Sequence, residues 1–455
     1  MCLPVQFPAQ TSASMGRVRV THSTGYETPL DVLPSMPGTP EPTRPRRGRR
    51  LGLPPRRCTA HRPRVAAGRW TRPGRPGTPQ TGLAVIGFRR FPVVLAAALA
   101  CLAGPTLACD AHGGQHAPLP ASFVSVRGNH LIGRTGEIIR LTGVNRSGAE
   151  YACADGWGIW DGPTDTNSAV KAMAGWHINA VRIPLNEDCW LGINGVKPAY
   201  SGANYQAAIA DYVARLERFG IIPVLNLHFS APGKIIPHDQ APMADEDHSL
   251  AFWRSLASYF RNDHHIIFDL FNEPYPDSKR DTTAAWSCVL HGGTCPGVGF
   301  RSAGMQQLVD VVRAAGAVQP LMIAGPQYAG DLNHWLQYAP RDPRHQLIAS
   351  IHIYEPSWAP CDARACWSSQ IATVARKVPV VAGEIGSKNC TARSIDPLLN
   401  WSDAHGVSYL AWAWNVGSCG GEPSLITNYG GTPTQTYGQG YKRHLAALYQ
   451  GKAPR

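Results

Sequence analysis

The chain has 455 residues, of which 44% are hydrophobic and 16% are charged. This composition excludes a coiled coil, a collagen and a wholly disordered chain, and its apolar runs are too short for a bundle of membrane spans. The formal net charge of +12 would fit a nucleic-acid-binding protein. However, residues 1–109 hold 16 basic and 3 acidic residues, so the other 27 basic and 28 acidic residues leave the remainder close to neutral.

Residues 1–84 form the first segment and are rich in proline, arginine, glycine and threonine. They show no sustained apolar period, so they cannot bury a core. We interpret this segment as disordered, or as sequence translated ahead of the true start of the protein. A basic tail that binds nucleic acid is the alternative.

Residues 85–109 have the pattern of a secretory signal peptide. Arg89 and Arg90 supply a positive charge, Pro92–Gly104 is an apolar stretch of 13 residues, and small residues suited to cleavage follow. A membrane anchor would need about 20 apolar residues. The pattern therefore predicts a secreted protein whose translation starts near the beginning of this segment, with a lipoprotein attached through Cys109 as the weaker alternative.

The remainder, residues 110–455, alternates short apolar runs with helical patterns. An extended stretch at 123–126, followed by polar residues, predicts a β-hairpin. Apolar spacing predicts amphipathic helices such as 205–219, through Ala208, Tyr212 and Leu216, and 305–315. The apolar runs that predict strands are 138–144, 180–184, 221–227, 266–271, 321–324, 347–353, 378–382 and 407–414.

Eight continuous apolar strands, each followed by a helix, predict a parallel sheet covered by helices. Eight such units favour closure into a single (β/α)8 TIM barrel over residues 110–455. An open, doubly wound sheet is the alternative. It is disfavoured because no GxGxxG motif follows the first strand.

In a (β/α)8 barrel the active site lies at the carboxyl ends of the strands. Polar, ionisable or aromatic residues end every predicted strand, and packing alone does not account for so many of them on one rim. We therefore expect them to form a functional site. They are Asn145, Arg182, His228, Asn272, Glu273, Gln327, His352, Tyr354, Glu384, Trp412 and Trp414.

Two glutamates at strand ends suit glycoside hydrolysis. Glu273 follows Phe271-Asn272, and Glu384 lies in Ala382-Gly383-Glu384. One carboxyl must carry a proton for the leaving oxygen, whereas the other must be ionised to attack or to activate water. The alternative is structural, with each glutamate capping a helix or pairing with Arg182. A separation of about 5–5.5 Å would give retention of configuration, and one of about 6.5–9.5 Å would give inversion.

These motifs together resemble glycoside hydrolase family 5, the cellulase family, over about residues 120–449. The resemblance implies a retaining mechanism with Glu273 as general acid/base and Glu384 as nucleophile. The motifs are Arg182-Ile183-Pro184, Leu227-His228, Asn272-Glu273-Pro274, His352-Ile353-Tyr354, Gly383-Glu384 and a tryptophan in the last strand.

The resemblance also implies roles for the neighbouring residues. Asn272 would hydrogen-bond the 2-hydroxyl of the sugar, while Arg182 and Tyr354 would hold the nucleophile ionised and oriented. The remaining members would line the subsite of the cleaved sugar or form its aromatic platform. They are His228 and His352 for the lining and Trp412 for the platform, with Trp414 as the alternative because it points the same way by the strand period of two.

Two positions depart from the family pattern and leave the substrate open. Asn226 stands where many members have aspartate, and Ile385 stands where phenylalanine is common in cellulases. We expect β-1,4-glucan to be cleaved. The alternatives are a β-mannanase, a β-1,3-glucanase, or a catalytically silent carbohydrate-binding barrel, which would be expected to lack one of the two glutamates.

Eight cysteines follow the predicted signal peptide, and this even number in a secreted chain predicts disulfides. No pair has zinc-site spacing. Although eight cysteines allow 105 pairings, all of them follow a predicted strand and precede the next helix, so adjacent loops suggest specific partners. The predicted bridges are Cys153–Cys189, Cys288–Cys295, Cys361–Cys366 and Cys390–Cys419.

The same loops carry six tryptophans, which would suit an endo-acting enzyme with several sugar subsites. Packing under the loops is the simpler interpretation of any single one. The acidic segment 245–249 could bind a metal, but it precedes a helix, so capping explains it more simply. We therefore expect no metal or cofactor, a monomer without stable membrane insertion, and a polysaccharide partner. The six tryptophans are Trp157, Trp160, Trp190, Trp286, Trp358 and Trp367.

Overall fold

The computed structural model describes residues 123–163, 166–355, 361, 364–417 and 422–451. The N-terminal segment, the expected signal peptide, Trp358 and Cys419 lie outside this part of the chain. Among the helices of the described ranges, none combines the length and the apolar composition that crossing a bilayer requires.

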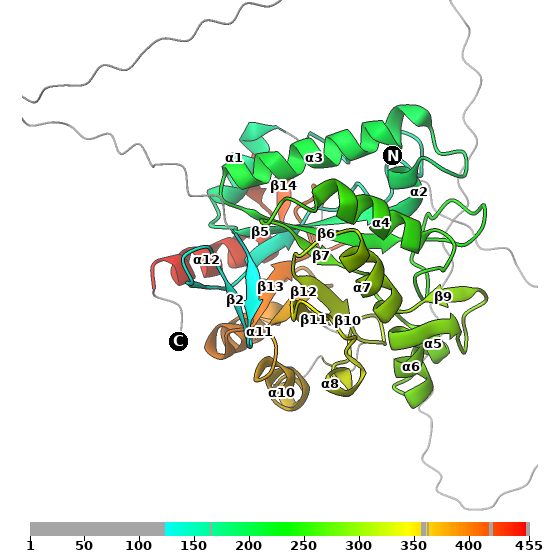
Figure 1. Ribbon diagram of the computed structural model, residues 1–455. Helices are drawn as coiled ribbons and strands as arrows, with labels where there is room; N and C mark the ends of the chain where they lie inside the picture. The colour runs from blue at the N-terminus through cyan, green and yellow to red at the C-terminus, as the bar shows by residue number, and fades with distance from the viewer. Residues whose placement is uncertain (1–122, 164–165, 356–360, 362–363, 418–421, 452–455) are drawn as a thin grey trace, which may run out of the picture. The chain divides into compact units, whose positions relative to one another are not determined.

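Eight parallel strands close into a barrel (Figure 1). Closure occurs where the last strand pairs with the first, through Tyr409 opposite Thr142, and where the fifth pairs with the fourth. This confirms the predicted (β/α)8 barrel and excludes the open sheet. The strands are β4 (Thr142–Asn145), β5 (Ala180–Asn186), β6 (Ile222–Phe229), β7 (Ile267–Asp269), β10 (Leu321–Ala324), β11 (Leu347–Glu355), β12 (Val380–Ser387) and β13 (Ser408–Ala411).

The predicted first barrel strand was wrong in extent, because the run 138–144 divides between two sheets. Ile138–Ile139 forms β3, the third strand of an antiparallel sheet with β1 (Ser125–Arg127) and β2 (His130–Ile132). The chain then turns into the barrel at Leu141, whose N–H donates to the Ser408 hydroxyl at 3.0 Å. The expected hairpin is therefore present, with one more strand than predicted.

This small sheet covers the end of the barrel opposite the carboxyl ends of the strands. Val124, Leu131 and Leu141 pack with the first buried residues of the barrel strands, such as Ile222. The Gln346 side chain, at the start of β11, accepts a hydrogen bond from the Val126 N–H at 2.7 Å and donates one to its carbonyl at 3.2 Å. The outer backbone groups of β1 are thus satisfied at this position.

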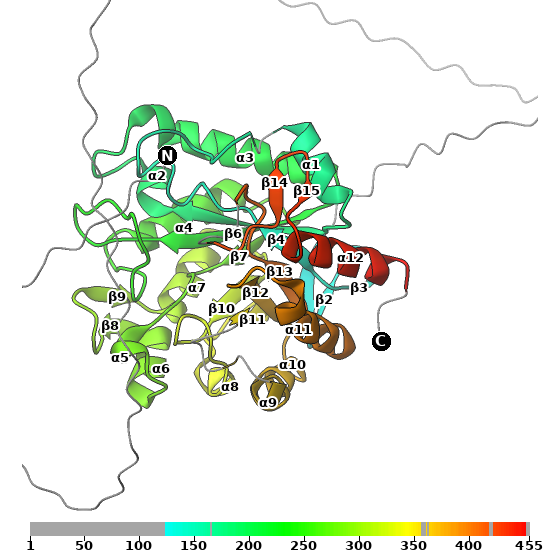
Figure 2. The same cartoon turned by 180° about the vertical axis from the view of Figure 1, so that it is seen from behind.

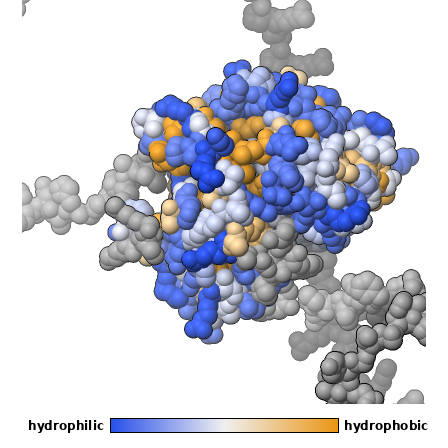
Figure 3. Space-filling model, turned by 90° about the horizontal axis from the view of Figure 1, so that it is seen from below, coloured by the Kyte–Doolittle hydropathy of each residue, from blue (hydrophilic) through white to orange (hydrophobic). Residues whose placement is uncertain are grey.

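The helices lie outside the barrel (Figure 2). On the face of the molecule drawn in Figure 3, most of the surface is hydrophilic and a band of hydrophobic residues lies in a recess. Both expected helices are present as α3 and α7, although Ala208 in the predicted stripe is only half-buried. The helices are α1 (Asn167–Ala174), α2 (Glu187–Leu191), α3 (Ala203–Arg218), α4 (Ser249–Phe260), α5 (Pro276–Lys279), α6 (Thr283–His291), α7 (Met305–Ala314), α8 (Trp335–Tyr338), α9 (Arg364–Cys366), α10 (Ala372–Ala375), α11 (Ala392–His405) and α12 (Tyr437–Tyr449).

The loops beyond the carboxyl ends of the strands carry further structure. The loop after β7 contains the hairpin β8 (Gly292–Thr294) and β9 (Arg301–Ala303), and the loop after β13 contains β14 (Ile426–Asn428) and β15 (Thr432–Pro433). A 3₁₀ turn at Pro198–Tyr200 and a π turn at Trp367–Ile371 complete the described elements.

Three predicted disulfides are confirmed, namely 153–189, 288–295 and 361–366. Cys390 is also disulfide-bonded, while Cys419, its predicted partner, lies outside the described residues. Cys189, Cys288 and Cys366 lie within short helices of these loops and not in irregular chain as expected. The bridges therefore fix loop segments that have their own secondary structure.

We expect the Cys153–Cys189 bridge to stabilise the protein more than the Cys288–Cys295 bridge. The first spans 36 residues and the second 7. The entropy of the closed loop predicts losses of about 4 and about 2 kcal/mol in the free energy of unfolding for the two double alanine variants. Denaturant unfolding of both variants measures this difference. Equal losses, or a larger loss for the short bridge, would contradict the entropic explanation.

Candidate active site

Arg182 lies at the centre of the residues that end the barrel strands. Its side chain, on β5, is fully buried. Nη1 donates to Asn145 at 2.9 Å and to Glu384 at 2.7 Å, Nη2 donates to Asn272 at 2.7 Å, and Nε donates to Asp269 at 2.7 Å. One guanidinium therefore links β5 to residues of three other barrel strands, β4, β7 and β12, and of the segment that directly follows β7.

Asp269 accepts the hydrogen bond from Nε of this guanidinium and so orients it. The sequence analysis did not predict Asp269 as a site residue. It ends β7, is almost fully buried, and also accepts a hydrogen bond from Asn226 at 3.1 Å. Burial raises the pKa of Asp269, and the charge of Arg182 opposes that rise. The available signal was a charged residue inside the apolar run 266–271.

The Glu384 carboxylate lies between the guanidinium of Arg182 and the hydroxyl of Tyr354. Its Oε1 receives the hydrogen bond from Arg182, and its Oε2 accepts one from the Tyr354 hydroxyl at 2.5 Å. Burial raises the pKa of Glu384, while His352 and Arg182 act in the opposite direction. The contacts expected for Arg182 and Tyr354 are therefore present, and both carboxylate oxygens are held.

Glu273 has different surroundings, without a direct guanidinium contact. Its Oε1 lies 2.8 Å from Nδ1 of His352, and its Oε2 accepts a hydrogen bond from Gln240 at 2.7 Å. Burial raises the pKa of Glu273 to about 7, against opposing effects of Gln240, Arg182 and Lys388. Gln240 comes from the loop between β6 and α4, where no sequence pattern marked it.

His352 lies between the two glutamates. One carboxylate oxygen of Glu273, one of Glu384 and a ring nitrogen of His352 lie within 4.8 Å of one another. Burial lowers the pKa of His352 to about 4, so the ring is neutral near pH 7 and its Nδ1–H can donate to Glu273. The spacing alone would allow a metal ion. However, both carboxylates already accept hydrogen bonds, and Arg182 supplies the positive charge.

Trp412, and not Trp414, belongs to the site. The Trp412 ring lies 5.6 Å from that of His228, with 16° between their planes, and its Nε1 donates to Glu422 at 2.8 Å. Trp414 is fully buried and packs edge-on against Trp176. The strand period of two could not separate these residues, because the chain leaves β13 at Ala411 and no longer alternates as a strand.

The histidine beside Trp412 is also fixed by its neighbours. His228 Nδ1 lies 2.9 Å from the Asn226 side-chain oxygen, and its Nε2 lies 3.5 Å from the Asn272 side-chain nitrogen. Asn226 therefore links His228 to Asp269. Asn226, which the sequence analysis noted only as a departure from the family pattern, is a positioning residue here.

Other expected rim residues do not join this cluster. Gln327 lies in a turn of three successive positive φ values and makes no side-chain hydrogen bond within the described residues. Trp190, Trp286 and Trp367 are buried, so packing under the loops is their role, whereas Trp157 is 49% exposed. Among the described loop tryptophans, the buried ones therefore do not form a row of sugar contacts.

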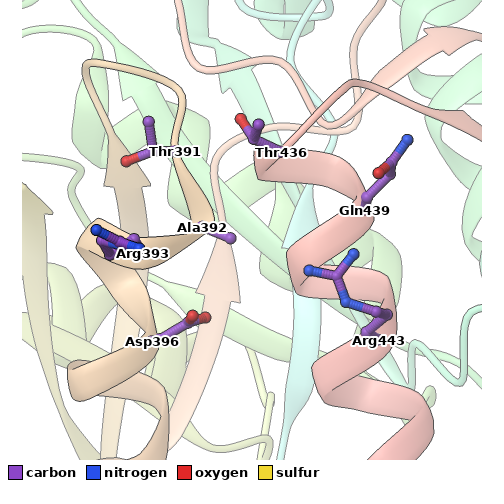
Figure 4. Close-up of a pocket in the computed structure, with 7 residues that line it drawn as sticks. All are labelled: Thr391, Ala392, Arg393, Asp396, Thr436, Gln439 and Arg443. Atoms are coloured by element: carbon purple, nitrogen blue, oxygen red, sulfur yellow. The ribbon is translucent and has the colours of Figure 1, made fainter.

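A cavity of about 540 Å³ lies elsewhere, between α11 and α12 (Figure 4). Asp396 and Arg443 extend into the gap from facing helices. None of its lining residues hydrogen-bonds Glu273 or Glu384 among the described contacts. The site of interest is the rim around Arg182.

Replacing Glu273 by glutamine should stabilise the protein at alkaline pH. The folded-state pKa of about 7 exceeds the ordinary value of 4.5, so the stability that this proton contributes at low pH is lost as pH rises through 7. The free energy of unfolding of Glu273→Gln, relative to the natural protein, should rise by about 2 kcal/mol between pH 5 and pH 8. Denaturant titrations measure this, with Glu246→Gln, which removes a half-buried carboxylate that pairs with Arg301, as control. A constant difference would contradict the raised pKa.

Curated relatives match part of the chain. An endoglucanase from Humicola insolens is 24% identical over 237 residues, which are 50% of this chain and 54% of that protein. A mannan endo-1,4-β-mannosidase from Cellvibrio japonicus is 21% identical over 286 residues, or 61% and 58% of the two chains. This chain thus spans little more than half the length of these relatives.

Solved structures share the fold. A β-glucanase from Saccharophagus degradans superposes with a TM-score of 0.54 at 20% identity, covering 73% of this chain and 95% of that one. An endocellulase from Pyrococcus horikoshii gives 0.55 at 19% identity, with 71% and 99% coverage. The family profile described as Cellulase (glycosyl hydrolase family 5) matches residues 133–418. This match covers more than half of the chain, which therefore belongs to the cellulase family, glycosyl hydrolase family 5.

Proposed function

We propose that this protein is a secreted, retaining glycoside hydrolase that cleaves β-1,4-glucan within the polymer. The observation that carries the proposal is the pair Glu273 and Glu384, whose carboxylate oxygens approach within 4.8 Å in two different environments. One glutamate has a pKa near neutrality, and the other is paired with Arg182. Disulfides in the loops support secretion, because they persist in oxidising compartments.

The two environments match two chemical tasks. Glu273, protonated below about pH 7, donates its proton to the leaving glycosidic oxygen. Glu384, whose ionised form is stabilised by the charge of Arg182, attacks the anomeric carbon and forms a covalent glycosyl-enzyme. Glu273, now a carboxylate, then removes a proton from water, which displaces the sugar from Glu384. Two displacements leave the anomeric configuration unchanged.

The separation of the carboxylates supports retention over inversion. An inverting enzyme needs about 6.5–9.5 Å between them to hold a water molecule on the far side of the sugar. One oxygen of each carboxylate lies within 4.8 Å of the other, a closer approach than that arrangement requires, and this supports retention. Direct attack by Glu384 fits this distance.

The neighbouring residues orient the sugar and the nucleophile. The side-chain oxygen of Asn272 is occupied by Arg182, so its amide nitrogen is the group available to a 2-hydroxyl. Trp412, backed by His228, offers an indole face to a pyranose ring. Tyr354 donates to Glu384 and keeps the second carboxylate oxygen aligned for attack.

A β-1,4-mannan is the second candidate substrate, because the mannosidase from Cellvibrio japonicus matches the longest stretch among the relatives compared. Glucose and mannose units differ at C2, where the proposed contact with Asn272 falls. The substrate must therefore be decided by measured rates on matched polymers.

Reducing-end release should be highest on carboxymethylcellulose and lower on glucomannan, mannan and laminarin. We expect Glu384→Gln and Glu273→Gln each to lower kcat by at least roughly 10³-fold, because each removes a group that reacts. Glu246→Gln, a glutamate remote from the site, is the matched control. NMR of the first product should show the β-anomer. Folded protein that binds oligosaccharides without cleaving any polymer would favour the silent carbohydrate-binding barrel, and an α-anomer would contradict retention.

The pH profile should report the proton on Glu273. Since the acid must be protonated, kcat/KM should fall as pH rises through about 7. Gln240 donates to the carboxylate and lowers its pKa, so Gln240→Leu should move the alkaline limb to higher pH. The acid limb serves as the internal control, because Gln240 does not contact Glu384. An unchanged alkaline limb in Gln240→Leu would separate Glu273 from the observed titration.

A further inference from the structure

A second cluster of ionisable side chains lies apart from the two glutamates. Glu187 and Asp188 begin α2, directly after β5, while Asp245, Asp247 and His248 precede α4. Both views place α2 beside α4 (Figures 1 and 2). Glu187, Asp188 and Asp245 are fully buried.

These three carboxylates lack the cationic partners that other buried carboxylates have. Asp269 pairs with Arg182, and Asp342 accepts two hydrogen bonds from Arg313. No arginine or lysine of the described residues forms an ion pair with Glu187, Asp188 or Asp245. Buried negative charge without compensation is costly, so bound protons or a bound cation must neutralise it.

The donor atoms are spaced as metal ligands are. One oxygen of Glu187, one of Asp188 and a ring nitrogen of His248 lie within 4.8 Å of one another. Donor atoms of Asp245, Asp247 and His248 form a second group within the same limit. His248 belongs to both groups, so they are one continuous cluster.

Asp188 provides an independent indication of a ligand. Its side chain is fully buried, and its Oδ2 has no hydrogen-bond partner within the described structure. Its Oδ1 accepts only a long hydrogen bond from Asn194, at 3.3 Å. Asp188 belongs to the group of possible metal ligands, and one of its buried carboxylate oxygens receives no hydrogen bond. Such an oxygen needs a cation or a proton beside it.

The other carboxylates are oriented by hydrogen bonds, as metal ligands usually are. Glu187 Oε1 accepts from the Ala231 N–H at 2.8 Å, and its Oε2 accepts from the Ser249 hydroxyl at 2.7 Å. Asp245 Oδ1 accepts from the His248 N–H at 2.7 Å. The predicted capping of α4 by this acidic segment is wrong, because the N-cap is His248 itself and it makes no side-chain capping hydrogen bond. The ring Nδ1 of His248 lies 3.4 Å from the Ala231 carbonyl oxygen, and Nε2 makes no hydrogen bond among the described residues.

We propose that Glu187, Asp188 and His248 bind a divalent metal ion, with Asp245 and Asp247 completing its negative surroundings. Carboxylates favour Mn²⁺, imidazole favours Zn²⁺, and the mixed set suits either ion. This site is separate from the catalytic proposal and revises the expectation that the chain binds no metal.

The metal would fasten the loop between β6 and α4 to the end of β5. That loop carries Gln240, which donates to Glu273 at 2.7 Å. It also supplies the Ala231 N–H that holds Glu187. Loss of the ion would therefore loosen a loop whose anchoring positions the proposed acid.

The test uses the full chain, purified without an affinity tag and dialysed against EDTA. We expect it to take up one equivalent of Mn²⁺ or Zn²⁺, measured by mass spectrometry of the metal, and to gain roughly 5 °C in Tm when the ion is restored. Asp188→Asn should lose both the uptake and the Tm gain. Glu246→Gln, in the same segment but outside the cluster, should keep both.

Two results would overturn the proposal. The first is a natural protein with less than one equivalent of either ion and the same Tm with and without EDTA, which would assign neutralisation to protons. The second is an Asp188→Asn variant with undiminished uptake. If that variant does not fold, His248→Gln gives the same test, because its side chain is 20% exposed.

Discussion

Four hydrogen-bonding directions of one guanidinium set the geometry of the rim. Arg182 is fully buried and touches an acceptor on β4, β7 and β12 and on the segment after β7. Two of these acceptors are the carboxylates of Asp269 and Glu384, so the single guanidinium forms ion pairs with both. A buried arginine with fewer partners would be costly, and all four of these acceptors are themselves buried.

The asymmetry between the glutamates follows from that arrangement. Glu384 receives a hydrogen bond from the guanidinium directly, whereas the side chains that hold Glu273 are His352 and Gln240. Burial alone would raise the pKa of both. The fold thus gives two chemically identical side chains different partners, a guanidinium and a phenol for Glu384 and an imidazole and an amide for Glu273.

The sequence was sufficient for features that repeat or that end a strand. Eight apolar runs predicted the barrel, and the strand-end rule located Arg182, Glu273 and Glu384. Prediction from the sequence failed where contacts between distant segments decide which sheet a strand joins or which side chain enters the site. The run 138–144 was predicted to be one strand, although Arg140 interrupts it at the point where the chain leaves β3 for the barrel. Gln240 reaches Glu273 from a loop, and no local pattern predicts which loop side chain points inward.

Tryptophan pairs illustrate the same limit. Trp412 and Trp414 have equivalent positions in a regular strand, yet one faces His228 and the other packs on Trp176. The departure from strand geometry after Ala411 separates them. Similarly, the number of loop tryptophans follows from the sequence but their burial does not, because it depends on distant partners such as Phe252 for Trp190 and Tyr338 for Trp286.

The small sheet at the opposite end of the barrel has a consequence for behaviour at high concentration. A strand at the edge of a sheet offers free backbone groups to another chain, and such edges promote aggregation. Gln346 occupies both backbone groups of Val126 on the outer edge of β1. At this residue of β1 no backbone group is therefore left for an added strand to pair with.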